Sequence, residues 1–389
     1  MSNIQSARQG MAVGFLSLTA LAAICFFAAS MVAFQSLQLE AFATSSAALA
    51  VSTFIGAVMQ FGAVYVLPSA ARSGSDARDR AFARLLFRSA TSCAGVVVVA
   101  LAIPLSEFFR YGLLVGAATG VQLVCDQLVR CRAELRFLGW LNATLHGIFL
   151  ASVIAASVSG TLTASVLLTM VFCVKAGFAL AVLVRFGLPK TDNGGVPRFE
   201  AGSLNGPLTA AALICLLGTV DVLLIQALDM NAADYIALRH FGYCLFLLVV
   251  QESAMPLLVA RLVKKGAFAV RQLILVAVAL SVAVGAASVV LGVLLAIMRG
   301  VDIAGPGLWV ALFFSLTSHS LAVIFLFAAL AFGVWRTRLI LLCGGGIVGL
   351  WILASVLPPD WTLCVVFATA FLNLLVAGSA LKNYAPIHP

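Results

Sequence analysis

Charged side chains are scarce in this 389-residue chain. Asp, Glu, Lys and Arg together make up 10% of the residues, against about 25% in a typical soluble domain. Hydrophobic residues make up 63%, and the mean hydropathy is +1.14. This composition leaves too little polar surface to cover a fold in water, which excludes an ordinary soluble enzyme. We therefore expect the chain to lie in a lipid bilayer.

Motifs that carry chemistry are also missing. The nine cysteines show no paired spacing, which argues against a disulfide framework and against a zinc site. The sequence has no Ser/His/Asp set at a shared depth, no Gly-rich phosphate loop and no metal-ligand cluster of the usual spacing. The net charge of +9 comes from scattered basic residues and not from a basic stripe. We expect no enzymatic activity, no cofactor, no metal and no nucleic acid partner.

Apolar runs long enough to cross a membrane fill most of the chain. A bilayer core about 30 Å thick needs roughly 20 apolar residues per helix. This criterion predicts an all-α polytopic membrane protein with twelve transmembrane helices, at residues 11–34, 43–67, 86–105, 111–129, 137–158, 161–184, 207–228, 235–260, 270–298, 303–333, 339–357 and 361–381.

Most Lys and Arg residues fall on one side of these predicted helices. If the N-terminus is cytoplasmic, 19 of the 23 basic residues lie at the chain ends or in the turns on the cytoplasmic side. The opposite side keeps only Arg110 and Arg299, and it carries six acidic residues. Cytoplasmic loops of membrane proteins are enriched in Lys and Arg. This distribution therefore predicts that both termini are cytoplasmic.

The two halves of the sequence show a weak internal repeat. Residues 18–25 read LTALAAIC and residues 208–215 read LTAAALIC, and an offset of 191 residues places Gln60 on Gln251. Six predicted spans precede a polar segment at 189–206, and six follow it. An even number of spans in each half makes the halves parallel. We expect two six-helix bundles, 1–188 and 207–389, joined by a cytoplasmic linker at 189–206 and related by a pseudo-two-fold axis along the membrane normal.

The stretch from 217 to 266 resembles the start of the second half of polysaccharide flippases. These are the Wzx-type O-antigen and exopolysaccharide transporters of the multidrug/oligosaccharidyl-lipid/polysaccharide (MOP) exporter superfamily. The resemblance rests on Asp221 in the seventh span, Asp234 and Tyr235 at the start of the eighth, and Pro256 and Leu262 before the following basic turn.

This resemblance implies a MATE-like fold and a location in the bacterial inner membrane. It implies that the protein turns undecaprenyl-pyrophosphate-linked oligosaccharide from the cytoplasmic to the periplasmic leaflet by alternating access, for the assembly of O-antigen lipopolysaccharide or exopolysaccharide. Candidate partners are then a coupling H⁺ or Na⁺, a polysaccharide polymerase and chain-length machinery.

Two other functions stay open at this point. A cation-coupled multidrug exporter of the same superfamily would share the bundle, but organic cations favour an acid-lined cleft, whereas pyrophosphate favours Lys and Arg. An integral-membrane polysaccharide polymerase or acyltransferase would need a sizeable outer loop or a His/Asp/Arg constellation at a membrane surface. The predicted outer loops are short, with the longest around residues 34–42.

Four charges fall well inside the predicted spans, where each needs a partner or a watery cavity. Lys175 and Arg239 are candidates for binding the pyrophosphate, Lys as a point charge and Arg as a bidentate fork. Alternatively, they neutralise Asp221 and Glu252 in two structural ion pairs.

Tyr235 and Tyr243 flank Arg239 at a distance of four residues, on nearly the same helix face. They are candidates for stacking against a sugar ring of the substrate. An interfacial aromatic anchor beside a snorkelling arginine fits the same pattern.

Asp221, Glu252 and His240 are the candidates for coupling or gating. A carboxyl group removed from water favours its protonated form, and histidine changes charge near physiological pH, so each could carry a coupling proton. Asp221 is preferred because its depth and its place in the resemblance agree. For His240, a hydrogen-bonded contact between helices is the alternative interpretation.

Three further patterns have structural interpretations. Asp126 lies four residues before Arg130, which predicts a local ion pair. The GxxxGxxxG row from Gly112 to Gly120 predicts close helix packing. The cluster of hydroxyl residues and histidine at 315–320 is typical of hydrogen bonds between membrane helices.

Overall fold

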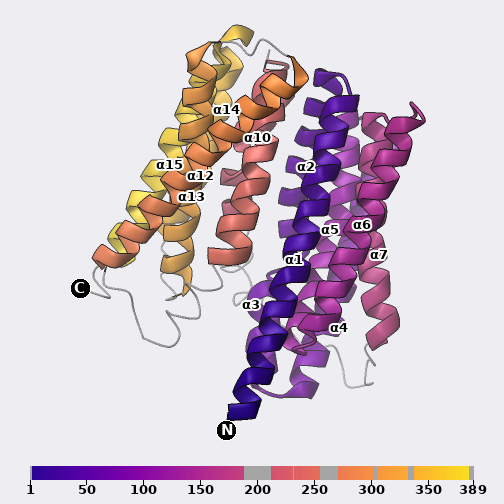
Figure 1. Cartoon of the computed structure of the whole chain (residues 1–389). Helices are drawn as coiled ribbons and strands as arrows, with labels where there is room; N and C mark the ends of the chain where they lie inside the picture. The colour runs from indigo at the N-terminus through magenta and orange to yellow at the C-terminus, as the bar shows by residue number, and fades with distance from the viewer. Residues whose placement is uncertain are drawn as a thin grey trace. The chain divides into compact units, whose positions relative to one another are not determined.

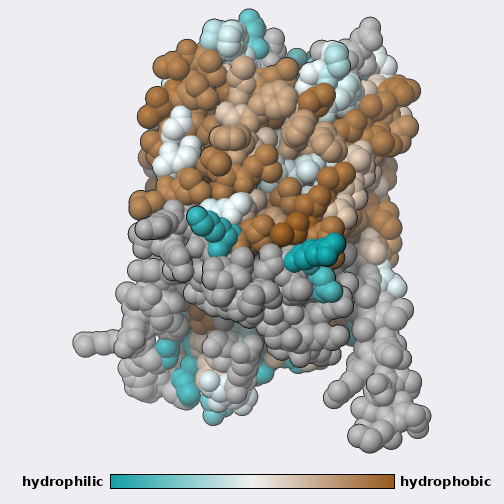
Figure 2. Space-filling model, turned by 90° about the vertical axis from the view of Figure 1, so that its left-hand side faces the viewer, coloured by the Kyte–Doolittle hydropathy of each residue, from teal (hydrophilic) through white to brown (hydrophobic). Residues whose placement is uncertain are grey.

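The computed structural model of the chain describes residues 2–187, 212–230, 232–254, 270–300, 305–331 and 337–384. This described part contains no β-strand, and ten of its helices are long and apolar enough to cross a membrane. Apolar side chains cover much of the described surface on the face drawn in Figure 2. These observations confirm the predicted all-α, multi-pass membrane fold.

The chain divides into two compact units, Met1–Ala211 and Ala212–Pro389. The predicted linker at 189–206 lies outside the described residues, so the predicted bundle boundaries stay a prediction. The helices of the first unit are α1 (Ser2–Ser36), α2 (Leu39–Met59), α3 (Ala63–Arg72), α4 (Ser75–Ala102), α5 (Glu107–Cys131), α6 (Leu135–Val158) and α7 (Ala164–Phe186) (Figure 1).

The second unit starts with helical residues at 212–217. It continues with α9 (Val220–Ala227), α10 (Ala233–Phe246), the π-helix η1 (Leu247–Ala254), α12 (Val270–Arg299), α13 (Pro306–Ala331), α14 (Thr337–Val356), a 3₁₀ turn η2 (Pro359–Trp361) and α15 (Thr362–Tyr384). In α14 the apolar stretch Leu341–Val356 is shorter than the other candidate spans.

Both units pack their helices in the same order. In the first unit the fourth span, α5, contacts the second, third and sixth spans, which are α2, α4 and α7. In the second unit the fourth span, α13, contacts the corresponding helices α10, α12 and α15. The first span also contacts the fifth in each unit, α1 with α6 and α9 with α14. This shared pattern is what a sequence repeat of two six-helix halves would produce.

Three predicted spans are not single regular helices. The predicted span 43–67 is interrupted between α2 and α3, and the described part of 207–228 has a turn at residues 218–219 between two helical segments. The predicted span 235–260 passes from α10 into the π-helix η1. Apolar residues flank all three places, so hydropathy predicts the span but not its interruption.

The glycine row on α5 packs closely against α2, as predicted. A Cβ atom added at Gly112 would lie 2.6 Å from Cβ of Val51, and one added at Gly116 would lie 2.6 Å from Cβ of Ile55. Since real Cβ atoms do not approach this closely, the two backbones are close because these residues are glycines.

Substitution of Gly116 by alanine is expected to lower the free energy of unfolding by about 1–3 kcal/mol, because the added methyl group must push α2 and α5 apart. The matched control is Gly95→Ala on α4, where an added Cβ meets nothing within 4 Å. Thermal unfolding of both variants in detergent checks the prediction. Equal melting temperatures for the two variants would show that the α2–α5 contact does not depend on glycine.

Candidate functional site

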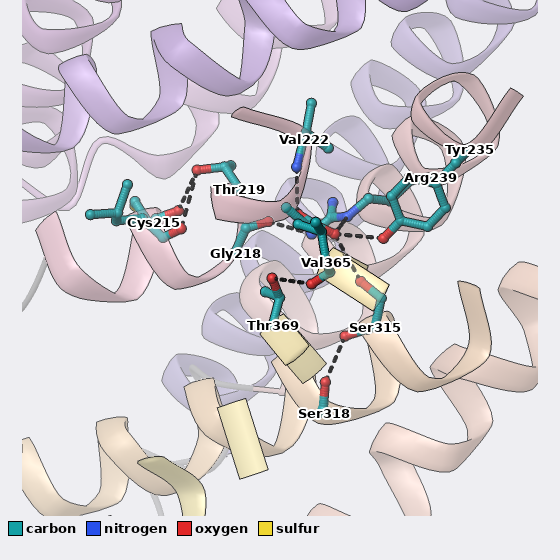
Figure 3. A network of polar contacts seen from close by, with 12 residues as sticks. Cys215, Gly218, Thr219, Val222, Tyr235, Arg239, Ser315, Ser318, Val365 and Thr369 are labelled. Carbon is teal, nitrogen blue, oxygen red and sulfur yellow. Dashed lines mark hydrogen bonds and ion pairs between the residues drawn. The ribbon is translucent and has the colours of Figure 1, made fainter. Parts of the chain in front are cut away.

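A polar network in the second unit surrounds Asp221, which lies in the first turn of α9. Figure 3 shows members of this network, among them Tyr235, Arg239 and Ser315. The side chain of Asp221 is fully buried, with 0% exposure. Its Oδ1 atom accepts the backbone N–H of Val222 at 2.9 Å. Its Oδ2 atom accepts hydrogen bonds from the Tyr235 hydroxyl at 2.5 Å, the Arg239 Nε at 2.6 Å and the Ser315 hydroxyl at 3.1 Å.

Arg239 connects this carboxylate to the interruption of the preceding helix. Its Nη2 donates to the carbonyl oxygen of Gly218 at 2.5 Å, and its Cζ lies 5.5 Å from the ring centroid of Tyr243. A helix that stops at residues 218–219 leaves carbonyl groups without their usual N–H partners. The guanidinium therefore neutralises Asp221 and also satisfies a carbonyl that the interruption exposes.

The position of the donors follows from the helix period. Tyr235 and Arg239 are four residues apart on α10, so their side chains leave the same face of the helix, as predicted. Ser315 reaches Asp221 from α13. One carboxylate thus joins three helical elements, and the buried ion pair has the additional hydrogen bonds that a charge needs away from water.

His319 packs against the same interruption. It lies one helical turn after Ser315 on α13, and its ring centroid is 4.6 Å from that of Phe246 and 6.0 Å from that of Tyr243. A Cβ atom added at Gly218 would lie only 2.5 Å from Cε1 of His319. The ring can therefore approach the backbone at position 218 only because that residue is a glycine.

A second polar group lies in the first unit, around Lys175 on α7. Asp126 and Arg130 form the predicted ion pair on α5, with Nε and Oδ2 2.6 Å apart. Lys175 is half-buried and interacts electrostatically with Asp126 and with His146 of α6. His146 is held by its own helix, because its Nδ1 lies 2.8 Å from the carbonyl oxygen of Asn142. Within the part of the chain that the structure describes, Lys175 itself makes no hydrogen bond or ion pair.

The structure says less about the two remaining candidates, His240 and Glu252. The ring of His240 on α10 contacts Phe241 edge to face, and its Nε2 lies 3.7 Å from Sγ of Cys244. Glu252 belongs to η1, and its side chain lies outside the described part of the structure. The coupling roles of both residues stay predictions.

The structure thus brings together four of the seven predicted site residues. They are Asp221, Tyr235, Arg239 and Tyr243, all in the second unit. Lys175 belongs to the first unit. Sequence reasoning gave Ser315 and His319 mainly as contacts between helices, with hydroxyl partners for a sugar as the alternative, and did not connect them with Asp221. Their spacing of four residues on α13 was the available signal, but it does not name the partner.

No protein-family model matches the chain, and no curated protein matches it. Among solved structures, the chain is similar to the inward-facing conformation of a multidrug resistance MATE family transporter of the MOP superfamily, with a TM-score of 0.57 and 12% sequence identity. The similarity covers 94% of each chain. It shows that the chain has a MATE-like fold over nearly its whole length, as predicted.

Proposed function

We propose that the chain is a flippase that moves an undecaprenyl-pyrophosphate-linked oligosaccharide across the bacterial inner membrane by alternating access. The MATE-like fold supports a transport function, and the excess of Lys and Arg on one side supports cytoplasmic termini. The choice of cargo rests on one observation: among the described residues, Lys175 makes no hydrogen bond or ion pair.

The charges around Lys175 favour an anion. An ammonium group inside an apolar bundle is unfavourable unless it meets an opposite charge or a water-filled cavity. Asp126 is already paired with Arg130, so these two residues and Lys175 together carry one excess positive charge. A pyrophosphate group would compensate that charge, and its oxygens would accept the hydrogen bonds of the ammonium.

A cation-coupled multidrug exporter is the second candidate. The observation in its favour is the similar structure, which is named a multidrug resistance transporter. An organic cation would need a carboxylate whose charge is available. Two carboxylates are buried in the described part of the chain, Asp126 and Asp221, and each forms a close ion pair with an arginine. The described charges therefore suit an anionic cargo better than a cationic one.

Asp221 has a place in this proposal as a gating residue. In the conformation described, it holds Arg239 and Tyr235, so neither side chain is available to a cargo. We propose that Asp221 releases them in another state of the transport cycle. Arg239 could then bind pyrophosphate, and Tyr235 and Tyr243 could stack against a sugar ring.

Purified protein in liposomes tests the function. Liposomes are loaded with a fluorescent polyprenyl-pyrophosphate-linked oligosaccharide, and its movement between leaflets is followed by quenching from outside. We expect faster movement than in protein-free liposomes, and no acceleration for a fluorescent phosphatidylcholine that carries no net charge. Acceleration of both lipids would indicate unspecific scrambling. Efflux of an organic cation under an ion gradient, without movement of the lipid-linked oligosaccharide, would favour the exporter.

A further inference from the structure

A three-residue turn interrupts the second span of the first unit. The N–H of Phe61 donates to the carbonyl of Val58 at 3.1 Å, and the N–H of Ala63 donates to that of Gln60 at 3.0 Å, so both bonds span three residues instead of four. Phe61 has φ 49° and Gly62 has φ 70°. The left-handed region is uncommon for a bulky residue such as Phe. The surrounding structure must therefore hold Phe61 in an unfavourable conformation.

Gln60 adds a second unfavourable feature at the same place. It is only 5% exposed, and its Oε1 atom has no hydrogen-bond partner among the described residues. A buried acceptor without a donor destabilises the conformation that contains it. A rearrangement that brings a donor to this oxygen is therefore favoured.

The second span of the second unit is irregular at the equivalent place. After Phe246 it continues as the π-helix η1, Leu247–Ala254. π-Helical turns are rare and occur often at functional sites. The repeated eight-residue segments are 190 residues apart, and for the following segment an offset of 191 residues places Gln60 on Gln251, which lies inside η1. Two independent departures from the α-helix thus coincide at equivalent positions of the repeat.

Proline follows each of these glutamines in the sequence. Pro68 comes eight residues after Gln60, and Pro256 comes five residues after Gln251. Proline has no N–H to donate, so a helix that contains it lacks one bond of its ladder. Pro68 lies inside α3, directly after the first interruption.

Close packing fixes each span just before it becomes irregular. Gly120 of α5 packs against Met59, the last residue of α2. In the second unit, Gly242 of α10 packs against Leu316 of α13, shortly before η1 begins. Since these contacts leave no room for the packed segments to shift, a change in the shape of either span is concentrated at its interruption.

We propose that residues 60–62 and Leu247–Ala254 are a repeat-related pair of bending points, at which the second span of each unit changes shape during the transport cycle. A helix bends most readily where its hydrogen-bond ladder is already broken. The inference rests on the proposed transport function but not on the identity of the cargo.

Hydrogen exchange of the full chain in lipid nanodiscs tests the local part of this proposal. We expect backbone amides at 61–66 and 249–254 to exchange at least about tenfold faster than those at 115–124 in the middle of α5, because broken ladders open locally. Protection at both places equal to that of the middle of α5 would overturn the proposal. This measurement requires no cargo.

A matched pair of variants tests the role in transport. Phe61→Ala combined with Gly62→Ala favours a continuous helix, whereas Phe61→Asn also removes the ring but tolerates the left-handed backbone. We expect the double variant to lose at least about tenfold in lipid movement, an effect of 1.4 kcal/mol or more, and Phe61→Asn to keep most of it.

Gly95→Ala on α4 controls for a general gain in helix stability, since its added Cβ meets nothing. Equal transport by the double variant and the wild type would overturn the proposal. If the wild type moves no lipid-linked oligosaccharide, the proposed function fails, and the exchange measurement still decides whether the bending points exist.

Discussion

Replacement of Asp221 by asparagine is expected to lower the free energy of unfolding by about 3–5 kcal/mol, because it leaves the charge of Arg239 buried without an opposite charge. The side chains of Asp221 and Arg239 are 0% and 4% exposed, so the freed guanidinium has no access to water. Asparagine has nearly the same shape, and the loss therefore reports the charge and not a cavity. Thermal or denaturant unfolding in detergent measures it.

Two other ion pairs of the chain provide a graded control. In the pair of Asp126 and Arg130 the arginine side chain is 37% exposed, and in the pair of Glu107 and Arg110 it is 42% exposed. Asp126→Asn should destabilise less than Asp221→Asn, since Arg130 can reach water. Glu107→Gln should change stability by no more than about 1 kcal/mol, as for other exposed pairs. Equal losses in all three variants would show that burial does not determine the effect.

A substitution of Arg239 in addition to that of Asp221 distinguishes two causes of the lost stability, the unbalanced charge and the lost hydrogen bonds. Removal of both charges, in Asp221→Asn combined with Arg239→Leu, should recover most of the stability, because a buried ion pair exchanged for neutral residues is often tolerated. The recovery should remain incomplete, since Gly218 then loses the donor for its carbonyl oxygen. No recovery would mean that Arg239 stabilises the helix interruption and not mainly the charge of Asp221.

The regular helices could be predicted from the sequence with good accuracy. The predicted span at 137–158 corresponds to α6, Leu135–Val158, and the span at 161–184 corresponds to α7, Ala164–Phe186. Both succeed because a long apolar run between polar turns has few other structures open to it in a bilayer. The Asp126–Arg130 pair was also predictable, since a spacing of four residues brings two side chains together on any helix.

The interruptions and the partners of Asp221 could not be predicted in this way. Apolar residues flank positions 60–62 on both sides, so hydropathy predicts a span there but not whether its helix continues or breaks. The positions of the residues along the predicted spans allowed Arg239 to neutralise either Asp221 or Glu252. Only the packing of α9, α10 and α13 brings its guanidinium to Asp221, and packing between helices leaves no periodic pattern in one sequence.

Substitution of Lys175 by methionine is expected to abolish most of the transport of a pyrophosphate-linked lipid while the protein stays folded. Methionine has a similar length and no charge, so packing around α7 should be kept. Loss of one partner of a buried charge-assisted contact is worth about 2–5 kcal/mol, which corresponds to a reduction of about 30-fold or more. The initial rate of lipid movement in liposomes, measured over a range of lipid concentrations, checks this prediction.

The control variants distinguish the charge of Lys175 from its position. Lys175→Arg keeps the positive charge and should retain part of the activity, although the planar guanidinium presents its donors differently. Lys382→Ala removes an exposed lysine near the end of α15 and should leave the rate unchanged. Stability should not fall in Lys175→Met, since the described structure gives this ammonium no hydrogen bond to lose. If Lys175→Met is as active as the wild type, the excess positive charge at Lys175 does not bind the cargo, and the case for an anionic substrate loses its main support.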